Sequence, residues 1–278
     1  MSFKFPPLSI PSHTRIGVFC TASPKKSGKS TVLRIAANEF SDAGYELVLL
    51  RHDIHNLLEA FAPTVRIELA KSADIMRGKT TMDLKHHAPL TDAMLSLPEH
   101  PRRIVMLDAS APGSGRIGSI LQAGRFNKWL ADREIFAMFC VPLRPIEDSA
   151  QGALEMMEEL HAVMPDHFVV PVPICDSNDL DILPDDHLFF EVIKMARHGV
   201  IHLPALGEEI ASGLERLDRP LSEIADPDSE EALAYIAKTS GHNRLMSGLI
   251  SEGAQDLVLA FEEAMRPLAL TPGGRDPA

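Results

Sequence analysis

The sequence predicts an α/β fold in which helices cover both faces of a doubly wound, mostly parallel sheet. Short and almost wholly apolar runs recur along the chain, and amphipathic helical patterns lie between most of them. Runs this apolar are typical of strands buried on both faces, as in a parallel sheet between helices. Such strand–helix alternation favours a doubly wound sheet, whose sites lie at the carboxyl ends of its strands.

The expected elements follow from these runs and the patterns between them. The strands are expected at residues 16–22, 47–50, 104–107, 135–141, 168–172 and 200–203. The helices of the sheet layers are expected at residues 30–43, 117–131, 149–163 and 186–197, and C-terminal helices at 207–216, 230–238 and 253–265. We therefore expect a single domain over residues 1–278, with an α/β core at 15–204, a helical C-terminal part at 205–266 and a mobile tail at 267–278.

Composition excludes several classes of protein. The chain has 278 residues, is 45% hydrophobic and carries a formal net charge of -12, which argues against a protein coated with positive charge for nucleic acid. The three cysteines are widely spaced, so neither a disulfide framework nor a zinc site is indicated. No apolar stretch approaches the length of a membrane span, and the N-terminus lacks the pattern of a signal peptide, so we expect a cytoplasmic protein.

The strongest motif lies between the first strand and the first helix, where residues 20–31 read CTASPKKSGKST. Its end is that of a P-loop, whose backbone N–H groups and helix N-terminus cradle phosphates. In that reading Lys29 reaches the terminal phosphates and the Ser30 hydroxyl binds Mg²⁺. Ser23 stands where the motif usually has its first glycine, and a lysine-rich surface turn is the alternative. The remaining predicted nucleotide-binding residues are Lys26, Ser27, Gly28 and Thr31.

A second element follows the next strand, where residues 49–56 read LLRHDIHN. An aspartate just past the carboxyl end of a parallel strand points into the same crevice as the phosphate loop. Asp53 is therefore a candidate for orienting or activating the water that attacks a γ-phosphate. The alternative is that Asp53 caps the helix that follows it.

The third element is the apolar strand that ends at Asp108 and continues as ASAPGSG. An apolar strand ending in aspartate is the Walker-B pattern, in which the carboxylate holds Mg²⁺ directly or through water. The Gly- and Ser-rich continuation predicts a mobile loop that senses the γ-phosphate.

These three elements, in this order, resemble the ParA/MinD-type ATPases, the deviant Walker-A family of the SIMIBI class of P-loop proteins. The resemblance covers about residues 15–225 and includes VPLRP at 141–145 and HGVIHLP at 198–204. It implies that Lys29 and Ser30 bind phosphate and Mg²⁺, that Asp53 serves hydrolysis, and that Asp108 is the Walker-B carboxylate.

The loop departs from the family pattern KGGxGK[ST], whose first lysine crosses to the partner subunit's nucleotide in a dimer formed around ATP. Pro24 occupies the position of that lysine, and Lys25 and Lys26 replace the two glycines. Either Lys25 or Lys26 is a candidate for the missing lysine, and Lys25, one position later, is our choice. Proline and residues with a β-carbon also restrict the loop, so slow hydrolysis or binding with little turnover is expected. This divergence is similar to that of plasmid-stability and partition-like members.

The resemblance implies a cofactor and partners: ATP with Mg²⁺, a homodimer formed on ATP binding, and a partner protein that stimulates hydrolysis. The implied role is a switch in DNA segregation, plasmid partition or stability, or DNA transfer. The alternatives are an ATP-dependent metabolic synthetase of the same fold and a nucleotide-binding regulator with little or no hydrolysis. Asn178, with Asp176 beside it, is the candidate for contact with the base.

Surface features support fewer predictions. Residues 102–144 hold 7 Lys/Arg against 3 Asp/Glu, which is consistent with a weak, non-specific DNA-binding face or with a solvated helix face. The last helix carries Glu262 and Glu263, and this acidity disfavours a membrane anchor. His86 and His87, like His52 and His55, lack a convincing set of metal ligands and are interpreted as packed or solvated.

Overall fold

A computed structural model gives the structure of the chain and describes residues 3–23, 27–52, 58–70, 81–268 and 270. In these residues six parallel strands form one sheet in the order β3-β2-β4-β1-β5-β6. The strands are β1 (Arg15–Thr21), β2 (Glu46–Arg51), β3 (Thr64–Arg66), β4 (Arg103–Asp108), β5 (Ile135–Leu143) and β6 (Phe168–Pro173). The predicted α/β class with a parallel sheet is therefore confirmed.

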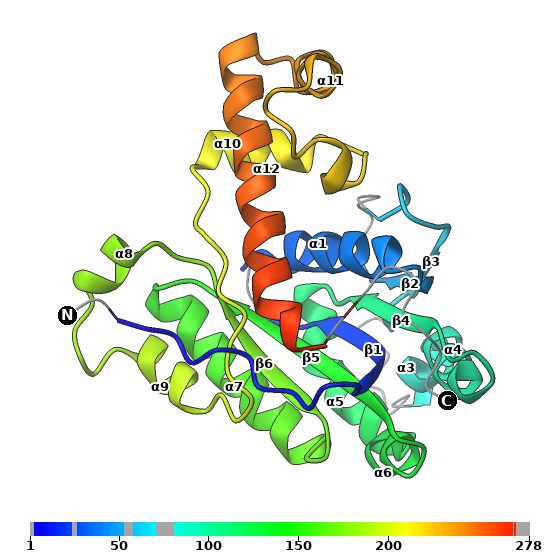
Figure 1. Cartoon of the computed structure of the whole chain (residues 1–278). Helices are drawn as coiled ribbons and strands as arrows, with labels where there is room; N and C mark the ends of the chain where they lie inside the picture. Colours follow the sequence, from blue (N-terminus) through cyan, green and yellow to red (C-terminus); the bar gives the residue numbers. More distant parts are fainter. Residues whose placement is uncertain (1–2, 24–26, 53–57, 71–80, 269, 271–278) are drawn as a thin grey trace.

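Two helical layers cover the sheet, and each has its own hydrophobic core (Figure 1). One core joins the sheet to α1 (Lys29–Asp42) and to the C-terminal helices. The other core joins the sheet to α4 (Ala88–Ser96), α5 (Ala111–Ala123), α6 (Phe126–Ala131), α7 (Glu147–Val163) and α9 (Leu188–Lys194). The shorter elements are α3 (Thr81–His86), η1 (Leu97–Glu99) and α8 (Ser177–Asp181). The strands are apolar on both faces because both faces are covered.

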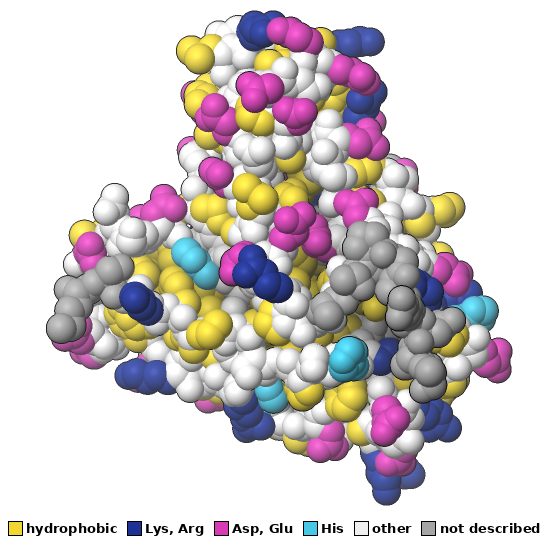
Figure 2. Space-filling view, in the orientation of Figure 1, with side chains coloured by type: hydrophobic (Ala, Val, Ile, Leu, Met, Phe, Trp, Pro, Cys, Tyr) yellow, Lys and Arg dark blue, Asp and Glu magenta, His cyan; other side chains and the backbone are white. Residues whose placement is uncertain are grey.

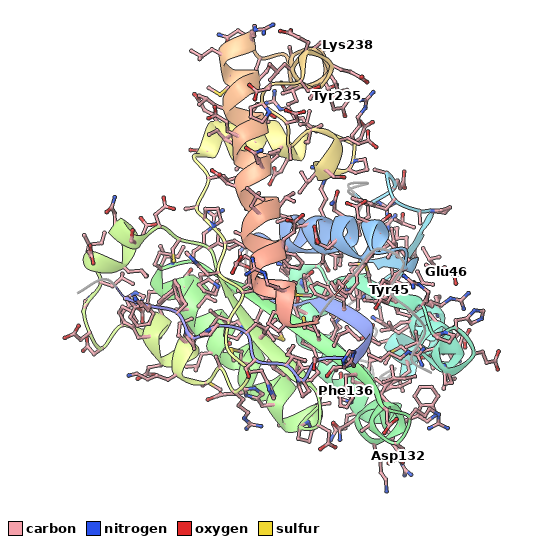
Figure 3. The ribbon with its side chains drawn as sticks, in the orientation of Figure 1. Tyr45, Glu46, Asp132, Phe136, Tyr235 and Lys238 are labelled. Carbon is pink, nitrogen blue, oxygen red and sulfur yellow. The ribbon has the colours of Figure 1, made fainter. Side chains whose placement is uncertain are left out.

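The C-terminal helices form what we call the arm: α10 (Glu208–Glu215), η2 (Leu221–Glu223), α11 (Glu230–Ser240) and α12 (Arg244–Met265). Figure 1 shows α12 running from the outer end of the arm back to the body, where η3 (Arg266–Leu268) ends it. Tyr235 and Lys238 lie on the arm, well apart from Tyr45 and Glu46 on the body (Figure 3). Acidic and apolar side chains are interspersed over the arm's surface (Figure 2).

The arm is anchored to the body by α12 and α1. Buried side chains recur along α12 at helical spacing, and Phe261 among them lies in the same core as Phe19 of β1, with ring centroids 6.4 Å apart. Polar side chains of α1 also form hydrogen bonds with backbone groups at the base of the arm. Arg34, 3% exposed, donates to the carbonyl oxygens of Leu214 and Arg219, and Asn38 accepts from the Ser222 N–H at 2.9 Å.

Two predicted helices and the predicted tail differ from the observed structure. The helix expected at 117–131 is two helices, because Arg125 adopts a left-handed conformation with φ 53° between α5 and α6. It also begins earlier, at Ala111, where Ser110 caps it by accepting from the Gly113 N–H at 3.2 Å. The last helix begins at Arg244 rather than 253, with Asn243 as its cap. In the predicted tail, Pro267 and Leu268 belong to η3, and residues 269 and 271–278 lie outside the described part.

The outer edge of the sheet also differs from the prediction. Residues 200–203 are not a strand; they run beside β6 with isolated parallel bridges, and Ile201 N–H donates to Pro171 O at 3.2 Å. The N-terminal segment lies beside them in turn, with Pro7 bridged to Val200. At the opposite edge, β3 was not predicted, because a run of three residues carries no detectable periodicity.

Candidate functional site

The first part of the site is the start of α1. Gly28 precedes the helix with φ +90°, a left-handed conformation that glycine adopts at little cost. A β-carbon at this position would lie 2.7 Å from Cδ1 of Ile174, the residue after β6. Gly28 therefore lets the loop pass close to the neighbouring strand end and turn into α1. The N–H groups of the first turn of α1 face this edge of the sheet, where helix N-termini favour anions.

The second part is a contact between the first helix and the fourth strand. The Ser30 hydroxyl donates to Oδ2 of Asp108 at 2.8 Å, although 78 residues separate the two. Asp108 is 8% exposed and pairs in register with Thr21, the last residue of β1. A hydroxyl and a carboxylate oxygen, side by side at a helix N-terminus, fit the all-oxygen coordination that Mg²⁺ prefers. The geometry thus brings together the two residues that the sequence predicts as metal ligands.

The third part is the turn that joins Asp108 to α5. Its Ala109 N–H donates to the carbonyl of Thr21 at 3.3 Å, and the hydroxyl of Ser114 accepts from the Ser23 N–H at 3.0 Å. Both serine side chains are fully buried. The prediction of a mobile Gly- and Ser-rich loop after Asp108 is wrong for this structure, because residues 111–115 form the first turns of α5. The turn is instead bonded to the start of the phosphate loop.

The fourth part is the end of β2. The His52 N–H donates to the carbonyl of Asp108 at 3.0 Å, so the chain after β2 arrives beside the same strand end. The His52 ring is 8% exposed and lies 2.9 Å, Nε2 to Nε2, from His87, which is fully buried. Of the two interpretations, packed or solvated, the structure shows His52 and His87 packed. Their pairing was not predicted, because nothing in sequence spacing links residues that are 35 positions apart. His55, the partner first weighed for His52, lies outside the described residues.

The remaining predicted residues divide into two groups. Ser27 is buried, while Lys29 and Thr31 are half-buried in the first turn of α1, at the same edge as Gly28. Asn178 is exposed on α8, and Asp176 caps that helix in a reciprocal pair with Asp179. Base contact by Asn178 therefore stays a prediction. Lys25, Lys26 and Asp53, with Pro24, lie outside the described residues.

Known structures of similar fold are MinD from Aquifex aeolicus, alone and with MinC, and McdA from Cyanothece. The MinC:MinD complex matches with 12% identity and a TM-score of 0.48, covering 81% of this chain and 96% of that one. MinD matches with 14% identity and a TM-score of 0.48, covering 82% and 96%. An ATP complex of a McdA variant matches with 13% identity and a TM-score of 0.42, covering 84% and 98%.

No protein-family model matches this chain, and neither does any curated protein sequence. At this level of identity the likeness concerns the fold and not the ligands or partners of this chain.

The basic residues of 102–144 do not share one face. Arg103 begins β4, at the amino end of the parallel strands, and pairs with Glu46, whereas Arg144 follows β5, at their carboxyl end. Arg116 is held by Asp83 at 3.0 Å, and the guanidinium of Arg133 lies over the Trp129 ring. Within the described ranges there is no cluster of three or more metal-binding side chains of the His, Cys, Asp or Glu types, and no helix has both the length and the apolar character of a membrane span.

Proposed function

We propose that this protein is a ParA/MinD-like ATPase that binds ATP with Mg²⁺ at the carboxyl ends of β1 and β4. The observation that carries the proposal is the 2.8 Å contact between the Ser30 hydroxyl and the Asp108 carboxylate at the N-terminus of α1. A helix N-terminus binds phosphate through the N–H groups of its first turn, and an adjacent oxygen pair binds the metal that accompanies it. The left-handed Gly28 supports the same reading, because it lets the backbone approach the ligand.

The residues of the chain have separate roles in this proposal. Lys29 pairs with the terminal phosphates, and Ser30 and Asp108 hold Mg²⁺, which when bound neutralises charge on the phosphates. The turn at 109–114 faces the phosphate loop through the Ser23–Ser114 hydrogen bond and fixes the position of Asp108. Asp53, which follows His52 in the chain, orients the attacking water. Hydrolysis is slow, because Pro24 replaces the first lysine of the family pattern and two lysines replace its two glycines.

We further propose that ATP binding drives formation of a homodimer and that a partner protein stimulates hydrolysis. The resemblance of the motifs supports a role as a switch in DNA segregation, plasmid partition or stability, or DNA transfer. Lys25 is the proposed contact to the second subunit's nucleotide, and Asn178 the proposed contact to the base. The division of the basic residues between the two ends of the parallel strands makes direct DNA binding weak in this proposal.

The test measures binding, assembly and turnover in one series. Purified protein is titrated with a fluorescent ATP analogue in the presence of Mg²⁺, its mass is measured by light scattering with and without ATP, and ADP release is followed. We expect Lys29→Ala to abolish binding and the ATP-dependent increase in mass. Lys128→Ala, which removes a lysine from α6 outside the site, is the matched control and should behave as the unmodified protein.

Each outcome separates the alternatives. Loss of binding in Lys29→Ala together with ATP-dependent dimers supports the proposed ATPase switch. ADP release only when a small acid is added indicates a metabolic synthetase instead. Binding without ADP release, with or without partner proteins, indicates a regulator that does not hydrolyse ATP. Equal binding by the unmodified protein and Lys29→Ala contradicts the nucleotide site itself.

A further inference from the structure

A pair of buried histidines lies directly beneath the turn that carries Asp108. His52 follows β2, and His87 precedes α4, so the pair connects two elements that are distant in sequence. Their rings meet edge to face with centroids 5.0 Å apart, and their Nε2 atoms are 2.9 Å apart. Two imidazoles at this distance share one proton in a hydrogen bond, so one donates and the other accepts.

The partners of His87 decide the direction of that bond. Nδ1 of His87 lies 2.7 Å from the carbonyl oxygen of Asp83, which only accepts, so this Nδ1 carries a proton. With its proton on Nδ1, the His87 ring accepts at Nε2, and His52 donates from its own Nε2–H.

This direction leaves Nδ1 of His52 without a proton. That atom is fully buried and has no hydrogen-bond partner among the described residues. Gly113, in the first turn of α5, covers it: a β-carbon on Gly113 would lie 2.0 Å from this nitrogen and 2.7 Å from Cε1. The His52 ring thus occupies the space that the missing side chain of Gly113 leaves. The distance between β2 and the first turn of α5 is set by this contact.

The first turn of α5 is tied to the candidate site on its other side. Gly113 is followed by Ser114, whose hydroxyl accepts from the Ser23 N–H of the phosphate loop. The same turn begins just after Asp108, whose carbonyl accepts from the His52 N–H. A second tie runs from Arg116 of α5 to Asp83 of α3 at 3.0 Å, and Asp83 also accepts from the Ala70 N–H at 2.9 Å. Helix α3 thus holds α5 at Arg116, in addition to the contact between the His52 ring and Gly113.

We propose that His52 and His87 are positioning residues that hold the turn from Asp108 to Ser114 in the geometry needed for hydrolysis. The proposal rests on the proposed ATPase activity. A small displacement of a group that positions metal or water lowers the rate of chemistry more than it weakens binding, because binding uses many contacts. The pair therefore acts on kcat and leaves the affinity for nucleotide nearly unchanged.

The kinetic test compares variants that keep or remove the hydrogen bond. His87→Leu removes the acceptor for His52, whereas His87→Gln keeps an acceptor oxygen on the side chain. We expect His87→Leu to lower kcat for ATP about 10-fold or more with KM changed less than about twofold, and His87→Gln to recover most of that loss. His86→Leu is the matched control, since His86 contacts the Glu68 carbonyl and lies outside the pair. Equal kcat in His87→Leu and His86→Leu overturns the proposal.

The structural test uses Gly113 and does not depend on catalysis. Gly113→Ala places a methyl group into the His52 ring, so it should lower the urea midpoint. His52→Ala removes the ring that the new methyl group meets. The double variant Gly113→Ala/His52→Ala should therefore be more stable than Gly113→Ala alone, so the effects of the two substitutions on stability are not additive. Nitrogen-15 NMR of the imidazoles should show His52 protonated at Nε2 only. Additive effects, or a proton on Nδ1 of His52, overturn the proposal.

The two proposals fail in different ways. An unmodified protein that neither binds nor hydrolyses ATP contradicts the proposed function. In that case the NMR assignment of the His52 proton and the combined Gly113→Ala and His52→Ala variants still test whether the histidine pair has the stated geometry. An active protein whose kcat is insensitive to His87→Leu contradicts the positioning role while the proposed function stands.

Discussion

At the scale of single residues, Gly28 illustrates how one backbone angle limits the choice of side chain. Gly28→Ala should destabilise the protein by about 1–2 kcal/mol, because a left-handed φ is costly for alanine and its methyl meets Ile174. Gly248→Ala is the control: it lies in α12 with open space around it, so the same substitution should stabilise by about 0.5–1 kcal/mol. Urea unfolding of both variants measures the difference. A stable Gly28→Ala would contradict the close approach.

The Ser30–Asp108 contact leads to a prediction about metal dependence. Asp108→Asn retains the size of the side chain and an oxygen that accepts from Ser30, but it removes the charge that holds Mg²⁺. We expect ATP turnover to fall about 100-fold and the concentration of Mg²⁺ needed for half-maximal turnover to rise. Titration of Mg²⁺ at fixed ATP provides the measurement. Asp132→Asn, on the body outside the site (Figure 3), is the control and should show neither effect.

The site residues differ in how far the sequence alone predicts them. Ser30 and Asp108 were predicted because each stands at a fixed place in a local motif, directly at the start of a helix or at the end of a strand. The structure adds that they touch. His87 was not predicted as a member of the site, because its position depends on how α4 packs under the sheet. Long-range packing of this kind leaves no local pattern in the sequence.

At the scale of elements, the errors in helix bounds have local causes. The run Ala-Pro-Gly-Ser-Gly at 111–115 is typical of a loop, yet Ser110 caps it and proline suits a first helical turn, so α5 begins there. Gly113 and Ser114 are tolerated in the helix because both are buried against the site. The start of α12 was placed too late, because its first turns expose Leu245 and Leu249 and therefore break the amphipathic pattern.

The junction between α1 and the arm gives a prediction about stability. Arg34→Ala leaves the carbonyls of Leu214 and Arg219 without their buried donor, so we expect a loss of roughly 2–4 kcal/mol. Hydrogen exchange of residues 214–224 should rise more than that of β1. Arg244→Ala breaks an exposed ion pair with Glu230 and should leave the urea midpoint nearly unchanged. Equal effects of the two variants would contradict a buried junction.

The face of α1 toward α12 also predicts a dependence on pH. Burial, together with the carboxylates of Glu262 and Asp42, raises the pKa of Glu39 to about 7. Because the pKa of this carboxyl is higher in the folded than in the unfolded protein, the folded protein becomes less stable as pH rises from about 4.5 to about 7. Glu39→Gln should therefore stabilise the protein at pH 8 and have little effect at pH 5. Urea midpoints at the two pH values test this, and an equal effect at both would refute it.

At the scale of the whole molecule, the arm and the body share one hydrophobic core. Phe261 of α12 lies against Phe19 of the central strand, so we expect the arm and the sheet to unfold together. The only tryptophan, Trp129, lies on α6, so its fluorescence reports on unfolding of the body. Far-UV circular dichroism instead reports on the helices of the body and of the arm together. The two urea transitions should coincide. A circular dichroism midpoint below that of fluorescence would show that the arm unfolds first.

The prolines of β6 bear on how copies of the protein meet at high concentration. Pro171 and Pro173 present carbonyls to residues 201–203 on the outer side of the strand and have no N–H to offer there. Residues 201–203 already occupy these carbonyls, so an incoming strand from another molecule cannot extend the ladder at β6, and the other edge is the three-residue β3. Both edges of the sheet, as far as the structure describes them, thus disfavour strand addition, so concentrated solutions should resist fibre formation. A dimer is then expected to form through side chains and loops, whose contacts a ligand is able to switch on and off.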